Sequence, residues 1–165
     1  MKTTITHPFP ALYDQNSKIL ILGSFPSVKS REQQFFYGHP QNRFWRVMAE
    51  VLNSPVPKNI PEKKSMLLRR GVALWDSIAR CTIEGSSDAS ITDVVPNDLS
   101  PIFAEASIRQ VFCNGKKSWE MYHRYIEPNS GKSAVCLPST SPANAAWSLQ
   151  RLSSAWEEAL SQYFK

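Results

Sequence analysis

The chain has 165 residues, of which 42% are hydrophobic and 20% are charged. This composition is typical of a globular domain and excludes a disordered chain, and no apolar run is long enough to span a bilayer. The formal net charge of +5 favours an anionic partner such as DNA.

The length suits one hydrophobic core, so we predict a single domain over residues 1–165. The polar N-terminal stretch does not resemble a signal peptide, and we expect a cytoplasmic protein with no membrane association. The three cysteines, Cys81, Cys113 and Cys136, are far apart and lack the spacing of zinc or iron–sulfur ligands. We therefore expect reduced, buried thiols, no metal and no cofactor.

Four short apolar runs predict buried strands, at residues 18–22, 72–75, 109–113 and 133–137. Helical patterns lie between and after them. The predicted helix starts are at or just after Pro40, Pro61, Gly115 and Ser141-Pro142. This alternation predicts an α/β fold with three α/β/α layers around a central, four-stranded, mainly parallel sheet.

A polar or glycine-containing loop follows each predicted strand, at residues 23–27, 76–77, 114–116 and 138–142. Ligands of parallel sheets bind beyond the carboxyl ends of the strands. We therefore expect the four loops to meet at one binding site.

These loops and their neighbours resemble a known superfamily. Residues 21–27 and 37–45 resemble the mismatch-specific uracil-DNA glycosylases, with a glycine–proline loop and then His-Pro-x-Asn-Arg-Phe-Trp. Residues 137–145 resemble the second, DNA-contacting motif of that superfamily. Residues 71–76, 84–86 and 114–116 are similar to the hypoxanthine-DNA glycosylases specifically.

The resemblance implies a monomeric enzyme that flips a deaminated base, above all hypoxanthine, from double-stranded DNA and hydrolyses its N-glycosidic bond. Uracil-excising relatives carry a catalytic Asp, Asn or Glu in the first motif, where this chain offers Ser24 and Phe25. Two alternatives remain. One is a mismatch-specific uracil or thymine glycosylase, and the other is a catalytically silent module that binds damaged DNA.

The important residue of the hypoxanthine branch matches Asn42, which we expect to be catalytic. Its amide cannot act as a general base, but it can orient a water through its carbonyl or donate to the departing base through its NH₂. The alternative is an asparagine that hydrogen-bonds its own helix start. Tyr37 matches an aromatic that stacks on the extruded base, and the alternative is a core aromatic.

The predicted base pocket comprises Gly23, Ser24, Phe25, Pro26, Tyr37, Asp76 and Asn114. Gly23 and Pro26 are expected to shape the loop so that backbone N–H groups face the ligand. The Asp76 carboxylate would accept a hydrogen bond from N1–H of hypoxanthine, unless it forms a turn or a helix cap. Asn114 would reach the same pocket or cap the next helix.

The predicted DNA contacts are Ser27, His39, Lys116, Ser139, Thr140, Ser141, Pro142 and Asn144. Hydroxyl groups and a lysine suit phosphate oxygens, although Lys116 could equally be a solvated helix lysine. His39 would cap its helix or touch a phosphate. Arg43 is interpreted as an internal ion-pair partner.

Overall fold

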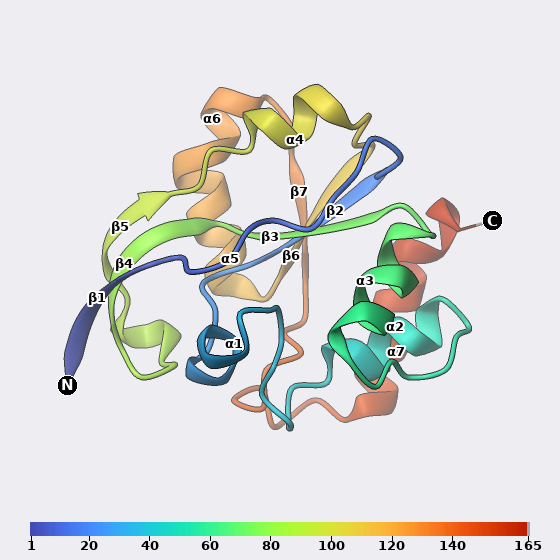
Figure 1. The fold of residues 1–165 in the computed structure, drawn as a ribbon, viewed down its shortest axis with the longest axis horizontal. Coiled ribbons are helices and arrows are strands. Elements are labelled where there is room, and N and C mark those ends of the chain that lie inside the picture. Colours follow the sequence, from blue (N-terminus) through green and yellow to red (C-terminus); the bar gives the residue numbers. More distant parts are fainter. Residues whose placement is uncertain (165) are drawn as a thin grey trace.

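The structure, a computed structural model, describes residues 1–164 and contains two β-sheets. The larger sheet has the strand order β3-β2-β6-β7, and all its neighbouring pairs are parallel (Figure 1). Its strands are β2 (Ile19–Gly23), β3 (Val72–Asp76), β6 (Gln110–Asn114) and β7 (Ala134–Leu137). Each of the four predicted strands is confirmed.

Helices cover both faces of this sheet. Ile19 and Ile21 of β2 belong to one core cluster, Leu20 and Leu22 belong to a second, and all four are 0% exposed. The first cluster includes residues of α2 (Phe44–Val51), α3 (Ile60–Leu68) and α7 (Leu149–Leu160). The second includes residues of α4 (Ser100–Glu105) and the π-helical turn η2 (Tyr122–Ile126). The three-layer α/β/α prediction is therefore confirmed.

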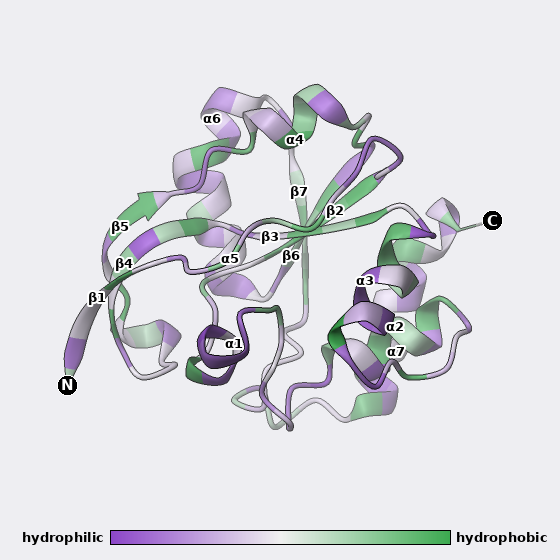
Figure 2. Cartoon of the chain, in the orientation of Figure 1, coloured by the Kyte–Doolittle hydropathy of each residue, from purple (hydrophilic) through white to green (hydrophobic). Residues whose placement is uncertain are grey.

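The remaining helices are short. They are α1 (Val28–Gln33), η1 (Asp88–Ser90), α5 (Lys116–Met121), α6 (Glu127–Ser130) and η3 (Ser161–Tyr163). In Figure 2 the strands of the larger sheet are mostly hydrophobic, while helices such as α1 and α3 carry hydrophilic residues. That pattern is expected of strands buried between two helical layers.

A second, antiparallel sheet was not predicted from the sequence. It has the order β1-β4-β5, with β1 (Lys2–Thr6), β4 (Ile78–Glu84) and β5 (Thr92–Pro96). Register shifts along β4 interrupt the alternation that would have identified it. Its buried face, with Ile78 and Ile83, packs against Phe25 of the first motif. This sheet brings the N-terminal segment and the β4–β5 connection to the carboxyl edge of the larger sheet (Figure 1).

Two predicted helix starts are wrong. Helix α2 begins at Phe44, with Arg43 as its N-cap, because residues 39–42 form a turn in which Asn42 N–H donates to the His39 carbonyl. Asn42 therefore precedes the helix. The last helix, α7, begins at Leu149 and not at Ser141-Pro142, because Ser148 caps it by accepting from Arg151 N–H.

The outermost strand also differs from expectation. β7 is an edge strand of the larger sheet, and Val135 is 40% exposed. Cys136 is exposed for the same reason, whereas Cys81 and Cys113 are buried, and all three are free thiols. Within residues 1–164, no helix combines the length and the apolar character that crossing a membrane requires.

Candidate active site

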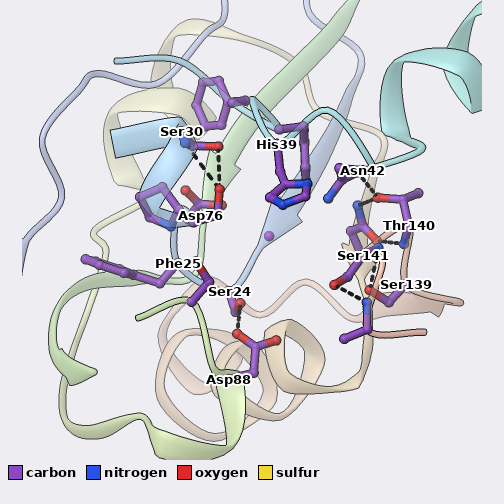
Figure 3. Close-up of a pocket in the computed structure, with 18 of the residues that line it drawn as sticks. Ser24, Phe25, Ser30, His39, Asn42, Asp76, Asp88, Ser139, Thr140 and Ser141 are labelled. Carbon is purple, nitrogen blue, oxygen red and sulfur yellow. Dashed lines mark hydrogen bonds between the residues drawn. The ribbon is translucent and has the colours of Figure 1, made fainter. Parts of the chain in front are cut away.

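A cavity of about 300 Å³ opens at the carboxyl ends of β2, β3 and β6. It brings together most of the predicted site residues (Figure 3). These are Gly23, Ser24, Phe25, Pro26, Ser27, Tyr37, His39, Asn42, Asp76, Asn114, Ser139, Thr140, Ser141 and Pro142. Its volume is at the lower end of the range for small-molecule sites. Lys116 and Asn144 instead line an adjoining groove.

Asn42, Thr140 and Asn114 form one hydrogen-bonded network on the wall of the cavity. Figure 3 shows the contact between Asn42 and Thr140. The Thr140 hydroxyl donates to Asn42 Oδ1 at 2.8 Å and accepts from Asn114 Nδ2 at 2.9 Å. Thr140 N–H donates to Asn114 Oδ1 at 3.0 Å. Asn42 Oδ1 also accepts from Phe44 N–H at 3.0 Å, which satisfies a free donor at the start of α2.

This network changes three predicted roles. Both lone pairs of the Asn42 carbonyl are occupied, so the carbonyl cannot also orient a water. The NH₂ group lies on the other side of the planar amide and donates to no residue in the described chain, so it is available to a ligand. Thr140 is 0% exposed and its hydroxyl is engaged, so it cannot make the predicted phosphate contact. Asn114 positions Thr140 and does not cap α5, whose N-cap is Gly115.

Asp76 is held by His7, a residue that was not predicted to belong to the site. His7 Nε2 lies 2.6 Å from Asp76 Oδ2, and the two side chains are 3% and 5% exposed. His7 Nδ1 is buried and has no partner among residues 1–164. An N–H at Nδ1 would have no acceptor there, which is costly. The geometry therefore favours the tautomer in which His7 Nε2–H donates to Asp76 Oδ2.

The other oxygen of Asp76 faces Gly23. A Cβ atom on Gly23 would collide with Asp76 Oδ1 and would lie 3.2 Å from the Tyr37 hydroxyl oxygen. Glycine is therefore required for the carboxylate to approach the end of β2. The first motif and the end of β3 thus meet at the deep end of the cavity.

Tyr37 is held in an uncommon conformation with φ = 53°. Its ring stacks on Phe44, with the ring centroids 4.0 Å apart and the planes at 18°. Only the opposite ring face could therefore stack on a base. Its hydroxyl is buried beside Gly23 and has no hydrogen-bond partner in the described chain. Burial, with the Asp76 carboxylate second, raises the pKa of Tyr37 above its ordinary value and keeps the phenol protonated.

Arg43 fixes the loop that follows β7. Its guanidinium donates to the carbonyls of Thr140, Ser141, Asn144 and Trp147. The predicted ion pair is wrong, because these partners are backbone oxygens. The role suits arginine, whose planar fork can serve several acceptors at once.

The groove beside the cavity is lined by Lys116, Lys117 and Asn144, among others. Lys116 is exposed at the start of α5. Asn144 Nδ2 donates to the Ser139 carbonyl at 2.9 Å, and so part of its side chain supports the loop. Ser139 Oγ accepts from Ser141 N–H, but its hydroxyl proton remains free to donate to a ligand. The His39 ring caps its own turn by accepting from Gln41 N–H, which leaves its other nitrogen for a ligand.

Several residues at the cavity were not predicted. The additional lining residues are Ser30, Phe36, Ser86, Asp88 and Ala143. Ser86 and Asp88 come from the connection between β4 and β5, which was not recognised as part of a sheet. Among residues 1–164 there is no group of three or more His, Cys, Asp or Glu side chains arranged to hold a metal ion.

Parallel strands that end in a cavity lined by polar and aromatic side chains define an α/β protein with a candidate ligand site at the carboxyl edge of its sheet. Residues 10–164 match the family model described as the uracil DNA glycosylase superfamily, and the chain belongs to that superfamily. A protein of Methanosarcina acetivorans named hypoxanthine DNA glycosylase is 36% identical over 155 residues, covering 93% of this chain and 96% of the relative.

A protein of Methanosarcina barkeri with the same name is 35% identical over 153 residues, covering 92% of this chain and 95% of the relative. A solution NMR structure from Methanosarcina acetivorans, of a candidate uracil DNA glycosylase, superimposes with a TM-score of 0.82 at 33% identity. The superposition covers 99% of each chain.

Proposed function

We propose that this protein is a DNA glycosylase that flips a deaminated base, preferentially hypoxanthine, out of double-stranded DNA and hydrolyses its N-glycosidic bond. Membership of the uracil DNA glycosylase superfamily supports the reaction class. The names of the two Methanosarcina relatives support the choice of base. The observation that carries the proposal is the chemistry at the deep end of the cavity.

That end presents an acceptor and a donor side by side. The Asp76 carboxyl group is an acceptor held by His7, and the Tyr37 phenol is a donor that has no partner among residues 1–164. Hypoxanthine carries N1–H next to the O6 carbonyl and so offers the complementary donor and acceptor. Adenine offers the reverse, an N1 acceptor next to an amino donor, and its N1 lone pair would face a carboxylate. Deamination of adenine to hypoxanthine therefore converts a base edge that does not complement Asp76 and Tyr37 into one that does.

Guanine shares N1–H and O6 with hypoxanthine, so this edge does not reject it. Guanine differs by its amino group and by its stable pairing with cytosine. Extruding a base costs least when the base is damaged or mispaired, and this cost favours hypoxanthine over guanine.

Bond cleavage places positive charge on the sugar and negative charge on the departing base. The Asn42 NH₂ group is a fixed donor, because Phe44 and Thr140 hold the carbonyl side of the same amide. A donor that needs no reorganisation stabilises the base anion most in the transition state. We assign Asn42 this role. Lys116 and the free hydroxyl donors of the 139–141 loop would hold phosphates and position the duplex.

We propose that the protein acts as a monomer in the cytoplasm. The decisive experiment is excision, with enzyme in excess, from duplexes carrying hypoxanthine, xanthine, uracil, ethenocytosine, adenine or cytosine. We expect hypoxanthine to be released and adenine and cytosine to remain. Binding of the hypoxanthine duplex without release of any base would instead indicate a silent damage-binding module.

A uracil glycosylase is the second candidate, because the structural neighbour carries that name. Uracil also presents an N–H next to a carbonyl, so it matches the same two groups. The first motif, however, offers Ser24 and Phe25 where uracil-excising relatives have an acidic or amide residue. In the same assay, uracil release as fast as hypoxanthine release would favour this candidate.

A further inference from the structure

The attacking water needs an acceptor that Asn42 does not provide. Hydrolysis at the sugar carbon requires a group that holds the water and accepts its proton. Phe44 N–H and the Thr140 hydroxyl already occupy both lone pairs of the Asn42 carbonyl. Asp76 is turned to the deep end of the cavity, against His7 and Gly23. Another acceptor must therefore lie closer to the sugar.

Asp88 is a carboxylate on the wall of the cavity with no role in base recognition. It begins η1, and its Oδ1 accepts from the Ser24 hydroxyl at 2.8 Å (Figure 3). Ser24 belongs to the first-motif loop, so the hydrogen bond ties Asp88 to that loop. Asp88 lies in the hairpin formed by β4, β5 and their connection. This hairpin is also anchored to α1, because Arg31 Nη2 donates to the Gly85 carbonyl at 2.7 Å. Asp88 Oδ2 accepts no hydrogen bond from any residue in the described chain.

Asp88 lies at the junction of the cavity and the adjoining groove. It lines both the cavity and the adjoining groove, as do Ser139 and Ser141. The groove contains Lys116 and Lys117, which suit the phosphates of the DNA strand. A nucleotide with its base in the cavity and its phosphates in the groove has its C1′ atom at the junction of the two.

We propose that Asp88 is a catalytic residue that holds and deprotonates the attacking water, with one oxygen fixed by Ser24 and the other facing C1′. The bond from C1′ to the base nitrogen breaks, and its electron pair leaves with the base. The water oxygen bonds to C1′, its proton passes to the Asp88 carboxylate and then to solvent, and the base takes a proton from solvent. The products are the free base and an abasic site. This inference rests on the proposed glycosylase function.

Electrostatics support the assignment. A carboxylate that faces phosphates weakens DNA binding, so binding alone does not explain the place of Asp88. A negative charge at this junction would stabilise the positive charge that develops on the sugar during cleavage. The Asp88 side chain is exposed to solvent where the cavity meets the groove, and partial desolvation by the surrounding protein raises its pKa above its ordinary value, opposed by the Ser24 hydrogen bond and Lys117. A carboxylate of raised pKa is a better proton acceptor near neutral pH.

The test compares Asp88→Asn and Ser24→Ala with wild type in single-turnover excision of hypoxanthine, alongside thermal melting and affinity for the uncleaved duplex. Asp88→Asn should lose about 100-fold or more in rate, the range for removing a general base. Its DNA affinity should stay equal or increase, since a negative charge is removed. Ser24→Ala should lose about tenfold through misplacement of the carboxylate. Asp93→Asn, in the same hairpin, exposed and outside both cavities, is the charge-matched control and should match wild type.

A folded Asp88→Asn variant that excises within about threefold of wild type would overturn the assignment. So would equal losses in Asp88→Asn and Asp93→Asn, because these would reflect charge alone. If wild type itself releases no base, the proposed function fails, and that outcome is distinct from a failure of the Asp88 assignment.

Discussion

The His7–Asp76 pair can be broken without disturbing the aromatic packing around it. The His7 ring lies 4.5 Å from Phe9 and 4.4 Å from Trp75, measured between ring centroids. His7→Phe keeps a ring in this place but removes the 2.6 Å hydrogen bond to Asp76. Hydrogen bonds to charged groups contribute about 1.5–3 kcal/mol, and here a buried carboxylate is left without its partner. The free energy of unfolding should fall by about 2–3 kcal/mol.

For a domain of this size, that loss corresponds to a Tm lower by roughly 5–10 °C. Excision of hypoxanthine should fall by about tenfold or more, because the acceptor for N1–H loses the group that orients it. His7→Gln, which can present an N–H donor in the same direction, should recover much of both losses. Melting and single-turnover excision measure the two effects. If His7→Phe melts within about 1 °C of wild type and excises at its rate, the pair does not support the site.

Three further outcomes are expected. Asn42→Asp keeps an oxygen acceptor for Phe44 N–H and the Thr140 hydroxyl but removes the NH₂ donor. Single-turnover excision should therefore fall by about 100- to 1,000-fold while Tm changes little. Excision within about threefold of wild type would show that Asn42 has only a structural role. Gly23→Ala should impair excision by pushing the Asp76 carboxylate out of place, and a fully active variant would show that this close approach is unnecessary. Affinity for undamaged duplex should fall steeply as salt rises, because phosphate contacts release counterions, and a flat dependence would show that the net charge of +5 is not used for DNA.

The sequence predicted the parallel sheet well because its strands are short, continuous apolar runs buried on both faces. The loops at their carboxyl ends followed from that topology, so Gly23, Asp76 and Asn114 were correctly brought to one cavity. The small antiparallel sheet was missed because bulges in β4 break its alternation. His7 and Asp88, both on or next to that sheet, were missed with it.

The hydrogen bonds within the site could not be predicted from local sequence patterns either. The Thr140 hydroxyl was predicted to contact a phosphate, but it donates its hydrogen bond to Asn42, which lies 98 residues away in sequence. Arg43 looked suited to an ion pair, but it binds backbone carbonyls of residues 140–147. Such pairings depend on how two loops from different strands meet, and no local propensity encodes that.

The cavity is expected to accept hypoxanthine and to release it from DNA. The most direct measurement is the single-turnover rate of wild-type enzyme on duplexes that differ only in carrying hypoxanthine or uracil. We expect hypoxanthine to be released with an abasic product, at least about tenfold faster than uracil, which corresponds to about 1.4 kcal/mol of transition-state discrimination. Equal or faster uracil release would contradict the substrate assignment, and release of neither base would contradict the glycosylase function.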